Sequence, residues 1–179
     1  MAESALRAVF LDRDGVLVVP TFRDGRSYAP TSLEHFHLYP DAADSLGRLK
    51  QAGFQLVVVT NQPDVGAGRV SRSTVEEMHA RMREALPIDA VKVCYHTRED
   101  ACTCRKPLPG MLLEAATEFH IDRGRSYMVG DRASDIGAGS AAGCRTIFIE
   151  RGYAAEPSPA GADWIVHSLG EATTSILAT

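Results

Sequence analysis

The segment AVFLDRDGVL, residues 8–17, joins an apolar run to two aspartates that stand two positions apart. The apolar residues 8–11 predict a buried strand, and Gly15 predicts the turn that follows it. Because side chains alternate along a strand, we expect Asp12 and Asp14 to project in the same direction from its carboxyl end. Two adjacent carboxylates repel each other unless a cation or a proton lies between them. A hard cation such as Mg²⁺, which prefers oxygen ligands and usually accompanies a phosphate, explains the pair most simply.

Alternating apolar runs and helical patterns predict an α/β protein. Strands are expected at residues 8–11, 54–59, 90–95, 126–129, 145–149 and 164–166, and helices at 41–53, 71–86, 107–120, 133–142 and from 168 onward. Such an alternation gives a central, mainly parallel sheet with helices on both faces, a Rossmann-like domain of three layers. The loop at residues 20–40 is long enough to be functional.

The size and composition of the chain predict one globular domain over residues 1–179. The chain is 45% apolar and 23% charged, which argues against disorder. Its formal net charge of −4 argues against nucleic acid or an acidic membrane surface as a partner. No apolar run approaches the ~20 residues of a membrane span, and residues 1–7 lack the long apolar segment of a signal peptide. We therefore expect a cytoplasmic monomer.

Polar groups follow the predicted strands in four places along the chain. The four segments are Asp12-x-Asp14, Thr60-Asn61-Gln62, Arg105-Lys106-Pro107 and Asp131-x-x-x-Asp135. In a parallel sheet all four would converge on the edge where open α/β sheets bind their ligands. Together they supply the groups that phosphoryl transfer needs.

The two aspartates of the first segment have separate expected roles. Asp12 is the candidate nucleophile, which attacks phosphorus to give an aspartyl-phosphate. Asp14 is the candidate general acid for the leaving alkoxide and then the base for the hydrolytic water. Asp12, the backbone carbonyl of Asp14 and Asp131 are the candidate Mg²⁺ ligands.

The other segments supply candidate phosphate-binding groups. Thr60 and the backbone N–H of Asn61, with Gln62 beside them, are expected to hold phosphate oxygens, while Lys106 neutralises their charge. Asp135 is expected to support the metal site by orienting Lys106 or a metal-bound water. A carboxylate in the first turn of a helix also meets the helix dipole, and both interpretations of Asp135 can hold together.

A second cluster lies in the loop after the third strand. Cys94 and His96 are separated by five residues from Cys102 and Cys104, and two such ligand pairs suit a tetrahedral Zn²⁺ ion. In a reducing compartment this spacing favours a metal over a disulfide framework. We expect a closed structural zinc site at residues 94–104; the alternative is scattered surface cysteines. Cys144 is expected to be an ordinary buried hydrophobe.

The order D-x-D-G, T-N, K-P and G-D-x-x-x-D between Val9 and Gly139 resembles the four motifs of the haloacid dehalogenase-like phosphohydrolases. The resemblance implies a Mg²⁺-dependent phosphomonoesterase that acts through an aspartyl-phosphate on a small phosphorylated metabolite. It also implies that Arg105 recognises the substrate, that Lys106 stabilises the transferred phosphoryl group, and that Arg132 either contacts the substrate or faces solvent.

The cysteine-rich loop narrows this resemblance to two groups of small-substrate phosphatases, which both lack a large cap domain. One removes the 7-phosphate of D-glycero-D-manno-heptose 1,7-bisphosphate, and the other hydrolyses histidinol phosphate. Residues 106–113 and 126–131 favour the heptose group, while the spacing between His96 and Cys102 suits both. Val18 and residues 63–69 depart from the family pattern near the expected substrate entrance. The remaining alternatives are another small sugar-phosphate phosphatase, a mutase or phosphotransferase that uses the same aspartyl-phosphate, and a non-catalytic phosphate-binding module.

Overall fold

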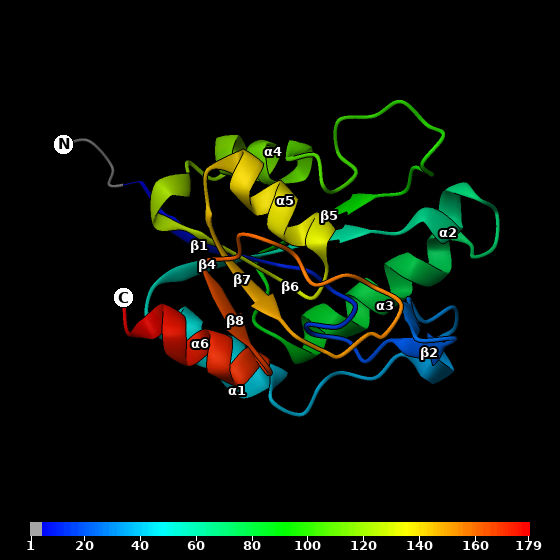
Figure 1. Ribbon diagram of the computed structural model, residues 1–179, viewed down its shortest axis with the longest axis horizontal. Helices are drawn as coiled ribbons and strands as arrows, with labels where there is room; N and C mark the ends of the chain where they lie inside the picture. The colour runs from blue at the N-terminus through cyan, green and yellow to red at the C-terminus, as the bar shows by residue number, and fades with distance from the viewer. Residues whose placement is uncertain (1–4) are drawn as a thin grey trace.

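The computed structural model describes residues 5–179, and a six-stranded sheet forms its centre (Figure 1). All pairings in this sheet are parallel, in the order β5-β4-β1-β6-β7-β8. The α/β prediction and all six strand positions are confirmed, with ends displaced by at most two residues. The expectation that residues 1–7 are not a signal peptide concerns in part residues 1–4, which lie outside the described residues. The strands are β1 (Arg7–Leu11), β4 (Phe54–Asn61), β5 (Ala90–Cys94), β6 (Tyr127–Gly130), β7 (Arg145–Ile149) and β8 (Trp164–Val166).

Helices cover both faces of the sheet, which makes the three expected layers (Figure 1). Alternate residues of β1 feed two apolar clusters: Val9 and Leu11 belong to one, and Ala8 and Phe10 to the other. This alternation is what a strand buried on both faces requires. The first face carries α1 (Ala42–Gln51), α3 (Arg72–Ala85) and α6 (Leu169–Leu177), and the second carries α4 (Gly110–Glu118) and α5 (Ala133–Ala142).

The direction in which the sheet grows reverses at β1. The chain passes from β1 to β4 and β5 on one side, and then crosses to β6, β7 and β8 on the other. At such a reversal a crevice opens outside the carboxyl ends of the central strands. Here those strands end at Leu11, Asn61 and Gly130, so the expected site segments meet at one edge. The backbone N–H of Asp12 donates to the carbonyl of Val129, 3.0 Å away, and fixes the first segment beside β6.

Two connections contain structure that the sequence did not predict. The loop expected at residues 20–40 holds the antiparallel hairpin β2 (Thr21–Arg23) and β3 (Arg26–Tyr28), followed by a 3₁₀ turn, η1 (Leu33–His35). Its tip has positive φ at Asp24 and Gly25, the backbone that Asp-Gly hairpin turns adopt. A short helix, α2 (Pro63–Gly66), follows β4. Three-residue strands and a single helical turn are too short to give a periodic sequence signal.

The helix expected at residues 107–120 is shorter in the structure. It runs from Gly110 to Glu118, because the chain first makes a turn in which the N–H of Leu108 donates to the carbonyl of Arg105. At its far end His120 adopts a positive φ of 52°, which a helix cannot continue through. Within residues 5–179, the segments outside the sheet and its helices are the hairpin and connecting loops, and no large cap is present there. No helix in this part of the chain is both long enough and apolar enough to span a membrane.

Candidate active site and metal centre

The ammonium group of Lys106 lies at the centre of the crevice. Its Nζ is 2.9 Å from Asp12 Oδ1 and 2.6 Å from Asp135 Oδ1, and it donates to the carbonyl oxygen of Val59 at 2.8 Å. The ammonium thus makes one hydrogen bond to the backbone and two ion pairs with buried carboxylates. Burial would lower the pKa of Lys106, but the carboxylates of Asp12 and Asp135 outweigh it and raise the pKa above its ordinary value. Lys106 is therefore a fixed, buried positive charge.

Three buried carboxylates surround this charge. One oxygen each from Asp12, Asp131 and Asp135 lies within 4.8 Å of the others. Burial, followed by the charge of Asp12, raises the pKa of Asp135 to about 6 and raises the pKa of Asp131 well above its ordinary value. Among residues 5–179, the buried Oδ1 of Asp131 has no hydrogen-bond partner. An unpartnered carboxylate oxygen in an all-oxygen cluster suits a hard divalent cation, so these residues fit Mg²⁺.

Two residues determine how the carboxylate of Asp131 is placed: Tyr153 donates a hydrogen bond to it, and Gly15 leaves the space that it occupies. The hydroxyl of Tyr153 donates to Asp131 Oδ2 at 2.5 Å, which leaves Oδ1 directed elsewhere. A Cβ on Gly15 would lie 1.8 Å from the same Oδ2, and Gly15 has a φ of +88°. Gly15 is therefore needed for space as well as for the expected turn. Tyr153 lies in a loop without a motif, and nothing in the sequence marks it.

Asp12 and Asp14 both line the cleft, as expected, but not for the expected reason. The strand ends at Leu11, so strand alternation does not continue to Asp14; the turn that follows places it. Asp12 Oδ1, the oxygen that forms the ion pair with Lys106, also accepts a hydrogen bond from the backbone N–H of Arg13 at 2.8 Å. The side chain of Arg13 folds back and donates Nε and Nη2 to the two oxygens of Asp14, at 3.1 and 3.0 Å.

The side chains of residues 61 and 62, at the end of β4, form hydrogen bonds with Asp14 and Lys106. The amide of Gln62 donates to Asp14 Oδ2 at 2.8 Å and to the hydroxyl of Thr60 at 2.9 Å. The side chain of Asn61 exchanges two hydrogen bonds with the backbone of Lys106. Thr60 is fully buried, and its hydroxyl accepts from Gln62, so its own proton remains available as a donor.

Asp135 makes one contact that bears on each of its two expected roles. Its Oδ2 accepts from the backbone N–H of Arg132 at 3.0 Å, as a first-turn carboxylate does at the start of α5. Its Oδ1 lies 2.6 Å from Lys106, as a residue that orients the lysine would. The same side chain therefore caps a helix and fixes the central cation.

Arg132 turns toward the hairpin. Its Nη2 donates to the carbonyl oxygen and to the hydroxyl of Ser27, both at 2.6 Å, and lies 3.5 Å from Glu156. Arg105 donates to the carbonyl of His96 at 3.2 Å. Both arginines line a cleft of about 1160 Å³ that also contains Asp12, Asp14 and Lys106. Of the two departures from the family pattern, residues 63–69 contribute Pro63, Asp64, Ala67 and Arg69 to the cleft lining. The expectation for Val18 is wrong, because Val18 is fully buried in the apolar core and does not line the cleft. The hairpin segment instead lines it with Arg26, Ser27, Tyr28 and Ala29.

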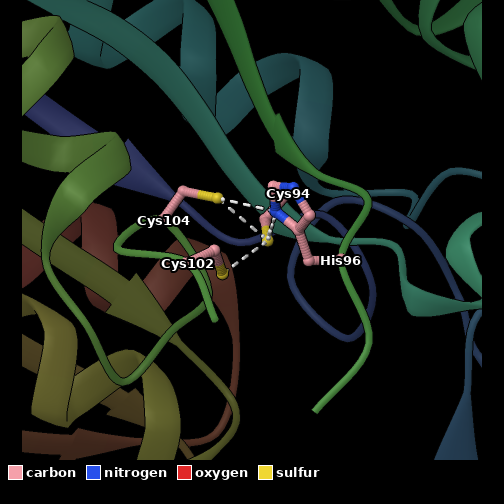
Figure 2. A group of neighbouring side chains, drawn as sticks. All are labelled: Cys94, His96, Cys102 and Cys104. Atoms are coloured by element: carbon pink, nitrogen blue, oxygen red, sulfur yellow. Dashed lines mark hydrogen bonds between the residues drawn. The ribbon is translucent and has the colours of Figure 1, made fainter. Parts of the chain in front are cut away.

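The four expected zinc ligands form one cluster beside this cleft (Figure 2). The sulfur of Cys94 lies 3.1 Å from that of Cys104 and 4.0 Å from that of Cys102. Nδ1 of His96 lies 3.3 Å from the sulfur of Cys104 and 3.5 Å from that of Cys94. The sulfur atoms are too far apart for disulfide bonds, and three sulfurs and one nitrogen at these separations suit a tetrahedral Zn²⁺ ion.

Cys144 lies outside this cluster, in the apolar layer beneath α4 and α5. Burial raises the pKa of its thiol to about 12, which keeps it uncharged. The structure thus agrees with the interpretation of Cys144 as an ordinary buried residue.

Comparison with known proteins identifies the class to which this fold and site belong. A model of the HAD-hydrolase-like family matches residues 103–172. The D-glycero-beta-D-manno-heptose-1,7-bisphosphate 7-phosphatase of Escherichia coli K12 is 34% identical over 98% of this chain and 96% of its own length. The protein of the same name from Pseudomonas aeruginosa is 33% identical over 80% of this chain and 81% of its own length.

Solved structures of heptose bisphosphate phosphatases share the fold of this chain. The D,D-heptose 1,7-bisphosphate phosphatase from B. bronchiseptica, crystallised with magnesium and phosphate, superposes with a TM-score of 0.83 at 28% identity, over 97% of this chain and 99% of that one. The corresponding enzyme from Burkholderia thailandensis gives 0.67 at 26% identity, over 97% and 99%. The chain belongs to the haloacid dehalogenase-like hydrolases, and the resemblance inferred from its motifs is confirmed. Its similarity to the heptose bisphosphate phosphatases extends over almost its whole length.

Proposed function

We propose that this chain is a Mg²⁺-dependent phosphomonoesterase that removes the 7-phosphate of D-glycero-D-manno-heptose 1,7-bisphosphate. One observation carries the phosphatase assignment: a buried lysine joins Asp12 and Asp135 at the reversal point of the sheet. The two carboxylates cluster with Asp131, whose Oδ1 has no hydrogen-bond partner among residues 5–179. The choice of substrate is supported by the E. coli relative, which is named for the heptose bisphosphate.

Asp12 is the proposed nucleophile. Both of its polar contacts fall on Oδ1, so Oδ2 is the oxygen we assign to the attack on phosphorus. The new bond joins Oδ2 to phosphorus while the bond from phosphorus to the sugar oxygen breaks. The fixed charge of Lys106 stabilises the negative charge that the phosphoryl oxygens carry.

Asp14 is the proposed general acid and base. It gives a proton to the departing sugar oxygen, and then takes a proton from the water that attacks the aspartyl-phosphate. That second attack breaks the bond between Oδ2 of Asp12 and phosphorus and releases inorganic phosphate. The contacts of Asp14 with Arg13 and Gln62 fix where its carboxylate stands during both transfers.

Asp12, the backbone carbonyl of Asp14 and Asp131 are the residues we assign to Mg²⁺, and Asp135 supports them through Lys106. When bound, Mg²⁺ supplies positive charge against the phosphate oxygens. The hydroxyl of Thr60 and the backbone of Asn61 are assigned to the same oxygens. We assign Arg105 and Arg132, which line the outer part of the cleft, to the rest of the substrate.

A structural Zn²⁺ ion is the second metal that we propose, held by Cys94, His96, Cys102 and Cys104. Four such ligands would fill a tetrahedral site and leave no open position, which is typical of structural rather than catalytic zinc. Lys106 follows Cys104 by two positions, and Gly110 N donates to the carbonyl of Thr103 at 3.1 Å. The ion would therefore fix the segment that carries Arg105 and Lys106.

A kinetic screen with Mg²⁺ tests the proposed function. We expect the highest kcat/KM for heptose 1,7-bisphosphate, a lower value for histidinol phosphate and other small sugar phosphates, and release of free phosphate. Both heptose anomers should be included, because the E. coli relative is named for the beta form. The Asp12→Asn variant should lose about 10³-fold or more of kcat. A preference for histidinol phosphate would reject the substrate, transfer of phosphate to a second metabolite would indicate a phosphotransferase, and binding without turnover would reject the enzyme.

A further inference from the structure

One buried titratable side chain has no part in the proposed reaction. His79 lies in the middle of α3, on the face that also buries Val75, Met78 and Met82. Only 7% of its surface is exposed. An imidazole among apolar residues requires a hydrogen-bond partner, and the structure supplies one from a distant segment.

That partner is Arg13, which stands between the two catalytic aspartates. Nη1 of Arg13 lies 3.1 Å from Nε2 of His79, across 66 positions of sequence. The loop after β1 passes beside α3 to make this contact (Figure 1). A guanidinium has donors only, so Nε2 of His79 must accept. The imidazole is therefore neutral, with its proton on Nδ1.

The charge state of His79 agrees with this geometry. Burial, followed by the positive charges of Arg13 and Arg83, lowers the pKa of His79 to about 3. A protonated ring would place a second cation 3.1 Å from a fully buried guanidinium. His79 thus acts as a fixed acceptor at neutral pH and does not titrate there.

The other edge of the same guanidinium holds Asp14. Its Nε and Nη2 donate to the two carboxylate oxygens at 3.1 and 3.0 Å, a two-point contact that fixes the plane of the carboxylate. The side chain of Arg13 is fully buried, so water does not take the place of an absent protein acceptor. If Nη1 lost its acceptor, a buried N–H would be left unsatisfied, and the guanidinium would have to turn to satisfy it. Turning would break the two-point contact with Asp14.

We propose that His79 is a positioning residue for this reaction: by accepting a hydrogen bond from Arg13, it holds the carboxylate of Asp14 in place for proton transfer to the leaving oxygen. The inference rests on the proposed function, in which Asp14 is the general acid. The amide of Gln62, just after β4, donates to Oδ2 of Asp14, so the carboxylate is held both from this segment and, through Arg13, from α3. His79 itself does not touch the substrate.

Two variants separate positioning from simple stability. His79→Leu removes the acceptor, and His79→Gln keeps an acceptor oxygen near the position of Nε2. For each variant and for wild type, kcat/KM is measured on heptose 1,7-bisphosphate and on p-nitrophenyl phosphate. The sugar alkoxide needs a proton to leave, whereas the p-nitrophenolate leaves without one. The ratio of the two kcat/KM values does not depend on how much of the protein is folded.

We expect His79→Leu to lower kcat/KM for the heptose substrate by about 10-fold more than for p-nitrophenyl phosphate, with KM little changed. His79→Gln should restore most of the ratio. Equal losses on both substrates would overturn the inference, while absence of wild-type turnover would instead reject the proposed function. Independently of activity, ¹⁵N NMR of the imidazole at pH 7 should show a neutral ring with the proton on Nδ1. A proton on Nε2, or a charged ring, would also overturn it.

Discussion

The side-chain amide of Asn61 and the backbone of Lys106 exchange two hydrogen bonds, each 3.1 Å long. They join the end of β4 to the segment whose ammonium contacts Asp12 and Asp135. We predict that Asn61→Ala lowers kcat by about 10-fold, because a small displacement of the lysine weakens its hold on the phosphoryl group. Steady-state kinetics test this, with Gln51→Ala, an exposed amide at the end of α1, as the control. Unchanged kcat in Asn61→Ala would show that the two bonds do not position Lys106.

Alanine variants of Gly15 and Gly53 test whether the space around Asp131 matters for Mg²⁺ binding, because the two glycines have similar backbone angles but different surroundings. Their φ angles are +88° and +85°, but a Cβ on Gly15 would lie 1.8 Å from Asp131 Oδ2, whereas one on Gly53 would meet nothing within 4 Å. Both alanine variants should lose about 1–2 kcal/mol of unfolding free energy from backbone strain. Gly15→Ala alone should also raise the Mg²⁺ concentration needed for half-maximal activity. Equal Mg²⁺ dependence in the two variants would refute the proposed role of Asp131.

The cysteines offer a matched pair. Cys102 belongs to the proposed zinc cluster, and Cys144 lies in the apolar layer. Elemental analysis should find about one Zn²⁺ per chain in wild type and in Cys144→Ser, and little zinc in Cys102→Ser. The melting temperature of Cys102→Ser should also fall, because zinc binding contributes folding free energy. Zinc-free wild-type protein, freshly purified, would contradict the assignment.

The raised pKa of Asp135 predicts a pH dependence of stability in metal-free protein. Its pKa is about 6 in the folded protein, above the ordinary value of 3.8. The folded state therefore binds the proton more tightly, and the resulting stability is complete below pH 3.8 and is lost as pH rises through about 6. The loss is on the order of a few kcal/mol. Denaturant unfolding in a chelator from pH 4 to 7 should show this loss in wild type and not in Asp135→Asn. Parallel curves for the two proteins would contradict it.

The sequence predicts this fold well because short apolar runs, which form the strands, alternate with longer helical stretches along most of the chain. The aspartate segments were also predictable, since strand ends in a parallel sheet meet at one edge. Tyr153 and His79 were not, because each acts through one contact with a residue far away in sequence: Asp131 for Tyr153, and Arg13 for His79. Arg13 itself stands inside the first motif, but nothing local shows that its side chain is buried and folds back onto Asp14.

The proposed reaction depends on a covalent aspartyl-phosphate at Asp12. The most direct measurement is to quench the enzyme during turnover with Mg²⁺ and heptose 1,7-bisphosphate, reduce it with borohydride, and map the product by peptide mass spectrometry. An aspartyl-phosphate is reduced to homoserine, so we predict homoserine at position 12 and no modification of Asp14, Asp131 or Asp135. Modification at another position, or unmodified Asp12 in protein quenched while the phosphoenzyme accumulates, would contradict the account.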